Sequence, residues 1–288
     1  MIRSVAGSIF SIITLLSICS CGKNPTTPPT PTTTNKCLLI SETVNGGPGY
    51  GASWVYQYDA DGHLLKGTNP PVNGQTPDGL MAINNNAIGI SFSAATYGSG
   101  TGKMIWSYFY AGDLKGGSPT SGYQDFTNAD GKSYPRWDQY IFGYDAKKRI
   151  TEVAINAGTI NISYDDNDNV VKMTFITNNG PRVISPIVTI EGYDNKPNPH
   201  VADPNIWKFT QQMFSWSYFT EYRVISALSK NNPGKITTDY PEDATSKTVD
   251  DIIYQYNDKN MPTVATVQRT FRGAKSSYQS NFYGYSCQ

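Results

Sequence analysis

A short unit in which a tyrosine precedes Asp or Asn recurs along this 288-residue chain. Each copy has aromatic or apolar residues two positions apart, then the Asp or Asn, then a polar turn. Full copies stand at residues 56–64, 142–150, 162–170 and 254–262, and a partial copy at 190–194. Residues two apart in a strand share one face, and Asp and Asn favour turns because their side chains bond to nearby backbone. Each copy therefore predicts a β-hairpin.

The stretches that follow three of these turns are also rich in strand-forming residues. They cover residues 151–155, 170–176 and 263–271. The tyrosines of the second and third copies, Tyr144 and Tyr164, are separated by one hairpin's length of chain. Repeats of this kind stack so that neighbours bury each other's aromatic face. We therefore expect an all-β fold, an antiparallel meander of stacked hairpins in one elongated domain over residues 37–288.

One short helix is expected within this domain, at about residues 204–215. Asp203 is suited to cap a helix and Pro204 to occupy its first position. Apolar residues then recur at helical spacing, at Ile206, Phe209, Met213 and Phe214. By contrast, residues 111–135 are rich in Gly, Ser and Asp with little periodicity, which predicts a long loop.

The first 20 residues have the pattern of an export signal. A basic residue, Arg3, precedes an apolar stretch that is too short to span a bilayer, for which about 20 apolar residues are needed. The residues before Cys21 resemble the bacterial lipobox, which implies cleavage before Cys21 and acylation of that cysteine. Cys19 is a second candidate, preceded by the less suitable Ile18, and an ordinary signal peptide is the remaining alternative.

Residues 21–36 are interpreted as the lipidated cysteine and a Pro/Thr-rich stalk. Proline favours extended geometry, so at about 3.1 Å per residue the stalk reaches about 40–45 Å. The protein is therefore expected in the cell envelope, attached to the outer membrane through its lipid. Acidic residues often follow the cysteine of surface-exposed lipoproteins, whereas Lys23 and Asn24 stand here. The sequence leaves surface and periplasmic orientations open.

Two further cysteines, Cys37 and Cys287, lie at the two ends of the predicted domain. Disulfides persist outside the cytoplasm, and a bridge between these residues would close a very long loop. Two unpaired thiols are the alternative. No second cysteine lies near either one, which disfavours a metal site.

The charge pattern argues against several classes of function. The chain has 23 basic and 23 acidic residues, with no basic block, so nucleic acid is not expected as a partner. Alternating acceptors at residues 165–169 resemble a calcium loop but lack its final Glu, and turn formation explains them equally well. We expect no metal and no cofactor.

No catalytic residue is predicted. The two histidines, His63 and His200, have no metal-binding spacing and are expected to be exposed polar residues. Paired carboxylates of a hydrolase would have to be assembled by the fold. The candidates for such a pair are Asp138, Glu152, Glu191 and Glu221.

The aromatic content is the main indication of a ligand. Five tryptophans and twenty tyrosines supply flat rings with polar tips, which suit sugars or peptides. Trp137, Trp106 and Tyr123 are the candidate ligand-binding residues, with Trp137 beside the predicted loop. The alternative, favoured for the tyrosines of the repeats, is that the rings fill the core.

The repeats resemble the YD repeats of Rhs-type bacterial proteins. More closely, the chain resembles Bacteroidetes lipoproteins of the DUF4595 type, whose Tyr-Asp hairpins accompany segments like residues 193–199 (YDNKPNP) and 228–233 (LSKNNP). An aromatic residue is expected in that family where His200 stands. The resemblance implies the fold and the envelope address, but no established activity.

These features predict a non-catalytic, envelope-anchored interaction module for protein or glycan. The alternative is a carbohydrate-binding accessory protein of a glycan-uptake system. A glycoside hydrolase or other hydrolase is the third reading. The predicted partners are the membrane, through the lipid anchor, and a glycan or protein ligand.

Overall fold

The chain divides into two compact units, residues 1–34 and 35–288. The computed structural model describes part of the second unit. The described residues are 37–46, 52–62, 64–68, 79–83, 87–95, 103–113, 118–128, 130–177, 186–200 and 220–287.

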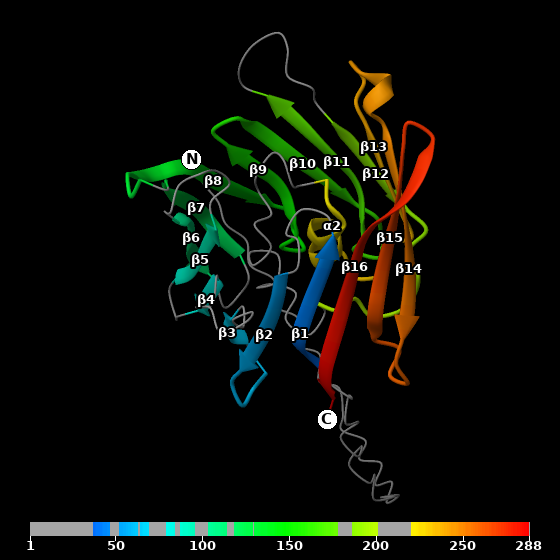
Figure 1. Cartoon of the computed structure of the whole chain (residues 1–288), viewed down its shortest axis with the longest axis horizontal. Helices are drawn as coiled ribbons and strands as arrows, with labels where there is room; N and C mark the ends of the chain where they lie inside the picture. The colour runs from blue at the N-terminus through cyan, green and yellow to red at the C-terminus, as the bar shows by residue number, and fades with distance from the viewer. Residues whose placement is uncertain are drawn as a thin grey trace, which may run out of the picture. The chain divides into compact units, whose positions relative to one another are not determined.

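Sixteen strands follow one another in chain order, each antiparallel to the next (Figure 1). They are β1 (Cys37–Gly46), β2 (Ala52–Tyr58), β3 (Leu64–Thr68), β4 (Gly79–Ile83), β5 (Ala87–Ala95), β6 (Lys103–Asp113), β7 (Ser118–Thr127), β8 (Ser133–Tyr144), β9 (Ile150–Ile155), β10 (Gly158–Tyr164), β11 (Val170–Thr177), β12 (Ile187–Glu191), β13 (Lys235–Asp239), β14 (Thr248–Tyr256), β15 (Pro262–Phe271) and β16 (Ala274–Cys287). The predicted all-β antiparallel meander is confirmed.

The meander is closed, because its first and last strands also pair. β1 lies antiparallel to β16, with Cys37 opposite Cys287 and Gly46 opposite Gln279. Cys37 and Cys287 form a disulfide across a sequence separation of 250 residues. Each of the sixteen described strands therefore has a partner on both sides.

A helix lies inside the ring of strands (Figure 1). It is α2 (Tyr222–Leu228), and it packs its apolar side chains into the same core cluster as residues from the strands around it. Tyr222 is 1% exposed and Ile225 is 0% exposed. No side chain caps its N-terminus, so the helix depends on this packing, as short helices do.

The helix predicted at residues 204–215 lies outside the described residues. The sequence did not predict α2, whose seven residues have neither a capping motif nor a long periodic pattern. Within the described part of the chain, no helix has the length and apolar character needed to cross a membrane.

The repeats form turns with one shared geometry. In each full copy, the Asp or Asn accepts a hydrogen bond from the backbone N–H two residues later, at 2.9–3.0 Å. The third residue after it has a positive φ, between 58° and 80°. These residues are Gly62, Lys148, Asp168 and Asn260. Asp and Asn supply the side-chain acceptor that such turns need, so the sequence predicts them well.

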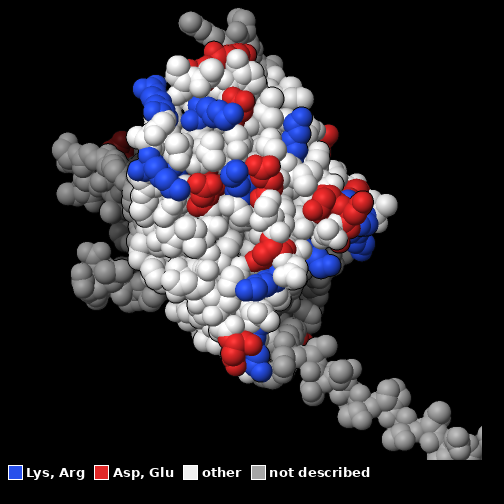
Figure 2. Space-filling view, turned by 90° about the vertical axis from the view of Figure 1, so that its right-hand side faces the viewer, with Lys and Arg blue, Asp and Glu red and all other residues white. Residues whose placement is uncertain are grey.

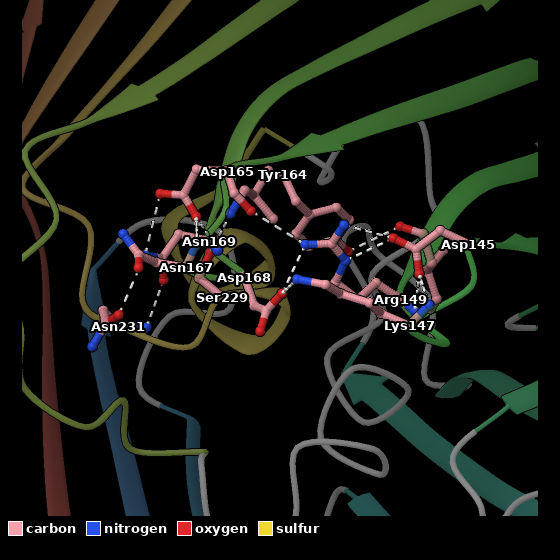
Figure 3. Close-up of polar contacts among 12 residues, drawn as sticks. Asp145, Lys147, Arg149, Tyr164, Asp165, Asn167, Asp168, Asn169, Ser229 and Asn231 are labelled. Atoms are coloured by element: carbon pink, nitrogen blue, oxygen red, sulfur yellow. Dashed lines mark hydrogen bonds and ion pairs between the residues drawn. The ribbon is translucent and has the colours of Figure 1, made fainter.

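Neighbouring turns are joined by ion pairs (Figure 3). Arg149 pairs with Asp145 of its own turn at 2.7 Å and with Asp168 of the next turn at 2.8 Å. Lys147 also reaches Asp168, at 3.0 Å. The Asp168 side chain is 40% exposed, and solvent-exposed pairs of this kind contribute about 0–1 kcal/mol each. The ion pairs therefore align the turns more than they stabilise the fold.

Four of the repeat tyrosines, together with Tyr285 of β16, bond to the backbone of the preceding strand, whereas Tyr256 of the fourth copy donates to the Asp194 carboxylate. In the first five cases the tyrosine hydroxyl donates to a carbonyl oxygen of the preceding strand, at 2.5–2.9 Å. The donor–acceptor pairs are Tyr58–Leu39, Tyr144–Pro119, Tyr164–Ile150, Tyr193–Val170 and Tyr285–Pro262. Their rings pack against the core. The tyrosines of the repeats are structural, as expected from the packing alternative.

The two segments that carry the family resemblance lie together around α2. A β-bridge joins Pro197 to Asn231. Asn232 donates through its side-chain amide to Asp194 at 3.2 Å, and the side-chain amide of Asn198 donates to the carbonyl oxygen of Ser226 in α2 at 2.6 Å. Asn198 therefore satisfies a backbone carbonyl of α2, and Asn232 links its own segment to the Asp194 carboxylate.

The long loop predicted at residues 111–135 is wrong in its main part. β6 continues to Asp113, and β7 and the start of β8 occupy most of the remainder. β7 pairs with β6 on one side and β8 on the other. Pairing with strands on both sides stabilises β7, although it contains Pro, Gly and Asp, which are uncommon in strands.

Candidate functional site: an exposed aromatic cluster on β7 and β8

Trp137 in β8 is the most conspicuous exposed ring among the described residues. Its side chain is 58% exposed, although burying a large aromatic side chain is worth several kcal/mol. Large exposed apolar groups that stand next to one another often mark binding sites. The local structure explains why this ring stays outside the core.

An unusually large bulge displays Trp137. Across β7 and β8, Gln124 pairs with Asp138 and Phe126 pairs with Tyr134. Three residues of β8, at positions 135–137, therefore stand opposite the single residue Asp125. Bulges of this kind change the direction in which side chains point and are common beside functional sites.

The bulge contains backbone strain that a side chain holds in place. Arg136 has a φ of 51°, in the left-handed region that a residue with a Cβ adopts at a cost of about 1–3 kcal/mol. Its backbone N–H donates to Oδ1 of Asp125 at 2.7 Å. Asp125 therefore stabilises the conformation that presents the next residue, Trp137.

Two further rings support Trp137. Phe126 and Tyr134 stack across the two strands with their centroids 5.9 Å apart. Trp137 lies 5.8 Å from Phe126 in a tilted arrangement and 5.6 Å from Tyr134, edge to face. We refer to Phe126, Tyr134 and Trp137 as the aromatic cluster. Pairs of this geometry favour a fixed orientation of the rings.

Cationic side chains lie over tyrosine rings on this hairpin. The Lys132 ammonium is 5.0 Å from the centroid of Tyr134. The Arg136 guanidinium is 5.5 Å from the centroid of Tyr123, which itself stacks on Phe109 at 4.9 Å. Exposed cation–π contacts contribute about 0.5–1 kcal/mol each. They restrain these long side chains beside the rings.

Polar side chains lie beside the backbone of Trp137. The Asn156 side chain donates to the backbone oxygen of Trp137 at 3.2 Å. The Asp138 carboxylate accepts from the backbone N–H groups of Gln139 at 3.0 Å and Asn156 at 3.1 Å. Burial raises the pKa of Asp138, although these two hydrogen bonds oppose the shift. The cluster thus combines an apolar platform with amide and carboxyl groups.

The three predicted ligand-binding residues fall on neighbouring strands. Trp137 belongs to the cluster. Tyr123 is on the same hairpin, but it lies an odd number of residues from Phe126 in β7 and so faces the opposite side of the sheet. Trp106 in β6 pairs in register with Phe126, and its side chain lies outside the described residues.

Sequence reasoning did not find Phe126 and Tyr134. Their alternation with polar residues was a strand signal inside a segment interpreted as a loop. The bulge has no clear signature in the sequence apart from Pro135, which cannot donate to the ladder.

The carboxylates considered for a hydrolase do not contact one another among the described residues. Glu191 pairs with Lys235 at 3.5 Å, and Glu221 accepts a hydrogen bond from Tyr278 at 3.3 Å. No group of three or more His, Cys, Asp or Glu residues in the described chain is arranged to hold a metal ion. In the turn at residues 165–169, Asp165 accepts backbone N–H groups of that turn.

The prediction for His200 is wrong, and that for His63 falls outside the described residues. His200 is 2% exposed, and burial lowers its pKa to about 4. It lies edge-on to Tyr283, in the position where the family resemblance led us to expect an aromatic ring. The neutral imidazole therefore serves as a core ring.

A buried ion pair lies in the same part of the interior. Glu42 is 0% exposed and accepts hydrogen bonds from Arg223 at 3.3 Å and Tyr56 at 3.2 Å. Burial would raise the pKa of Glu42, but the charge and hydrogen bonds of Arg223 outweigh burial and lower it. Glu42 is fully buried and the Arg223 side chain is 18% exposed, and the pair connects α2 to β1.

The chain was compared with known proteins. No family model matches it, and no curated protein does. The crystal structure of a porin-like protein from Bacteroides uniformis ATCC 8492 aligns with a TM-score of 0.49 and 12% identity, over 86% of this chain and 96% of that one. A porin-like protein from Bacteroides vulgatus ATCC 8482 aligns with a TM-score of 0.39 and 12% identity, over 86% and 99%. The function of this chain has to be inferred from its own residues.

Proposed function

We propose that this protein is a non-catalytic, lipid-anchored module of the cell envelope that binds a glycan on the aromatic cluster. The observation that carries the proposal is the exposure of Trp137 on a strained bulge. Strain of this kind persists where the surrounding structure enforces it, commonly at functional sites. Here Asp125 and Asn156 bind the backbone on either side of the ring.

The chemistry of the cluster suits a sugar. A pyranose ring presents C–H groups on one face and hydroxyl groups around its edge. The indole of Trp137 offers a flat apolar surface for the face. Asn156, which contacts the Trp137 backbone, and Lys132, which lies over Tyr134, provide an amide and an ammonium group for the hydroxyls. A rigid platform also lowers the entropic cost of holding a ligand.

A peptide ligand has less support. Many proteins bind peptides by adding a strand to an exposed sheet edge. The sheet described here is closed through the β1–β16 pairing, so its strands leave no such edge.

The proposed location in the cell envelope follows from the N-terminal sequence. Cys21 would carry the lipid and residues 22–36 would form the stalk, which leaves the binding domain near the membrane surface. We retain the proposed relation to lipoproteins of the DUF4595 type on the strength of residues 193–199 and 228–233. An accessory role in glycan uptake is consistent with such an anchored binding module.

A glycan array probed with the purified full-length chain tests the proposal. We expect binding to one class of glycan, and a loss of about 30-fold or more in affinity in Trp137→Ala, as for a central binding residue. Ile141→Ala is the matched control, since Ile141 lies on the same strand, is 65% exposed and is outside the cluster. No binding on the array, or equal losses in both variants, would refute the proposal.

A further inference from the structure

A hollow distant in sequence from the aromatic cluster lies between the 3-10 turn η1 (Ala244–Ser246) and the β15–β16 hairpin. Its volume is about 740 Å³, within the range of about 300–1,000 Å³ found for small-molecule sites. The lining residues are Ala244, Thr245, Lys247, Val249, Thr270, Arg272 and Gly273.

The charges that line the hollow are of one sign. Lys247 and Arg272 are its ionisable residues, and neither forms an ion pair among the described residues. By contrast, on the face shown in Figure 2, basic and acidic side chains are interspersed, with wide uncharged areas between them. Two cations without an ion-pair partner among the described residues therefore face the same hollow.

The nearby carboxylates are engaged elsewhere. Asp243 accepts hydrogen bonds from Ser246 at 2.5 Å and from the backbone and side chain of Thr245. These bonds lower its pKa, and the charge of Arg272 contributes to a smaller extent. Asp251 pairs with Lys275 at 3.2 Å. Neither carboxylate lines the hollow.

The local backbone holds Arg272 in place. Arg272 and Gly273 have φ values of 50° and 77° and form the tight turn of the hairpin. Nε of Arg272 donates to the carbonyl oxygen of Thr245 at 3.3 Å, and the guanidinium lies 4.9 Å from the Phe271 ring. Its two Nη groups have no acceptor among the described residues. Gly273 adds no side chain that would block approach to them.

We propose that this hollow binds a small organic anion through its carboxylate group. A planar guanidinium whose Nη groups have no acceptor in the described part of the chain matches a carboxylate in two parallel hydrogen bonds, and the Lys247 ammonium adds a second charge. Ala244, Val249 and the methyl group of Thr270 provide an apolar floor for the body of the ligand. This site is independent of the aromatic cluster and of the glycan proposed to bind there.

Isothermal titration of the purified full-length chain tests this site, with glucuronate as the probe and glucose as its neutral counterpart. We expect glucuronate to bind, glucose not to bind, and binding to weaken as salt is raised. Acetate and inorganic phosphate are titrated as further probes. Acetate binding as well as glucuronate would show that the carboxylate alone suffices, and a preference for phosphate would overturn the assignment.

Three variants test whether glucuronate binds to the residues that line the hollow. Arg272→Asn removes the guanidinium while keeping a residue that tolerates the left-handed backbone, and we expect glucuronate affinity to fall about tenfold or more. Lys247→Gln should give a smaller loss without altering the turn. Lys275→Gln is the matched control, because Lys275 is on the same hairpin but pairs with Asp251. Absence of glucuronate binding, or equal loss in Lys275→Gln, would overturn the proposal.

Discussion

The hydroxyl of Tyr164 donates to the carbonyl oxygen of Ile150 at 2.9 Å, linking the end of one hairpin to the first residue of a strand in the hairpin before it. Tyr193 repeats this relation with Val170, and Tyr285 with Pro262. In all three cases the acceptor is the residue at which the return strand begins. Tyr164 and Tyr193, which belong to the repeats, thus join successive hairpins, while the Asp shapes the turn within each.

Tyr164→Phe should destabilise the protein by about 1 kcal/mol, because the ring still packs while one partly buried hydrogen bond is lost. Urea unfolding measures the change. Tyr123→Phe is the control, since its hydroxyl has no hydrogen-bond partner among the described residues. It should leave the free energy of unfolding within about 0.5 kcal/mol. Equal effects of the two variants would show that the tyrosine ladder has no energetic role.

The sequence predicted those features that depend on local chemistry. In the repeats, the side chain of an Asp or Asn accepts hydrogen bonds from the backbone N–H groups two and four residues later, and this shapes the turn. These hairpins were therefore evident from the sequence. The ladder of tyrosine hydroxyls was not evident, because it depends on how far one hairpin stacks along another. The closure of the sheet through β1 and β16 was also not evident, because it too depends on how distant parts of the chain meet.

The incorrect sequence predictions have a common cause: the observed structure depends on contacts between segments that are distant in sequence. β7 is a strand because it has partners on both sides, although Pro119, Gly122 and Asp125 are weak strand formers. His200 is buried because the interior around α2 accepts it as a neutral ring. Trp137 was identified from residue type, but the bulge that exposes it arises from the register between β7 and β8.

Glu42→Gln should destabilise the protein by about 3–5 kcal/mol, because it leaves the Arg223 charge buried without its partner. The midpoint of urea unfolding reports the loss. Asp251→Asn is the matched control, since its ion pair with Lys275 is exposed and should be worth about 1 kcal/mol or less. If Glu42→Gln were as mild as this control, the interior ion pair would not anchor α2.

Stability should fall as the pH is lowered from about 6.5 to about 4, because of His200. Burial lowers the folded-state pKa of His200 from 6.5 to about 4, while the charges of Glu42 and Arg223 have smaller and opposing effects. Protonation therefore favours the unfolded chain. The contribution is complete above pH 6.5 and is lost towards pH 4, by about 3 kcal/mol in total.

Urea unfolding at several pH values in this window tests the role of His200. His200→Phe has no titrating group, and an aromatic residue suits the site, so its stability should vary less across the window than that of the wild type. Glu42 remains in both proteins and provides the common background. Parallel pH profiles for the two proteins would assign the dependence to other groups.

Replacing both Cys37 and Cys287 by Ser should lower stability, because the disulfide restricts the unfolded chain over a separation of 250 residues. The loop-entropy estimate for such a loop is about 5 kcal/mol, as an upper value. Reducing the wild type should have the same effect as the double substitution. Equal stability of the oxidised wild type and the double variant would show that the β1–β16 pairing alone keeps the sheet closed.

Trp137→Ala should separate binding from folding. Its ring is mostly exposed, so the loss of contacts with Phe126 and Tyr134 should cost about 1 kcal/mol or less, while glycan affinity falls as proposed.

Asp125→Ala tests whether the bulge matters, because it removes the acceptor that holds Arg136 in its left-handed conformation. It should weaken glycan binding while leaving the indole in the protein. The chain has five tryptophans, so the fluorescence change on glycan titration that disappears in Trp137→Ala is the part that reports on this ring. Full affinity in Asp125→Ala would mean that the ring needs no strained support, and that the bulge is incidental to the site.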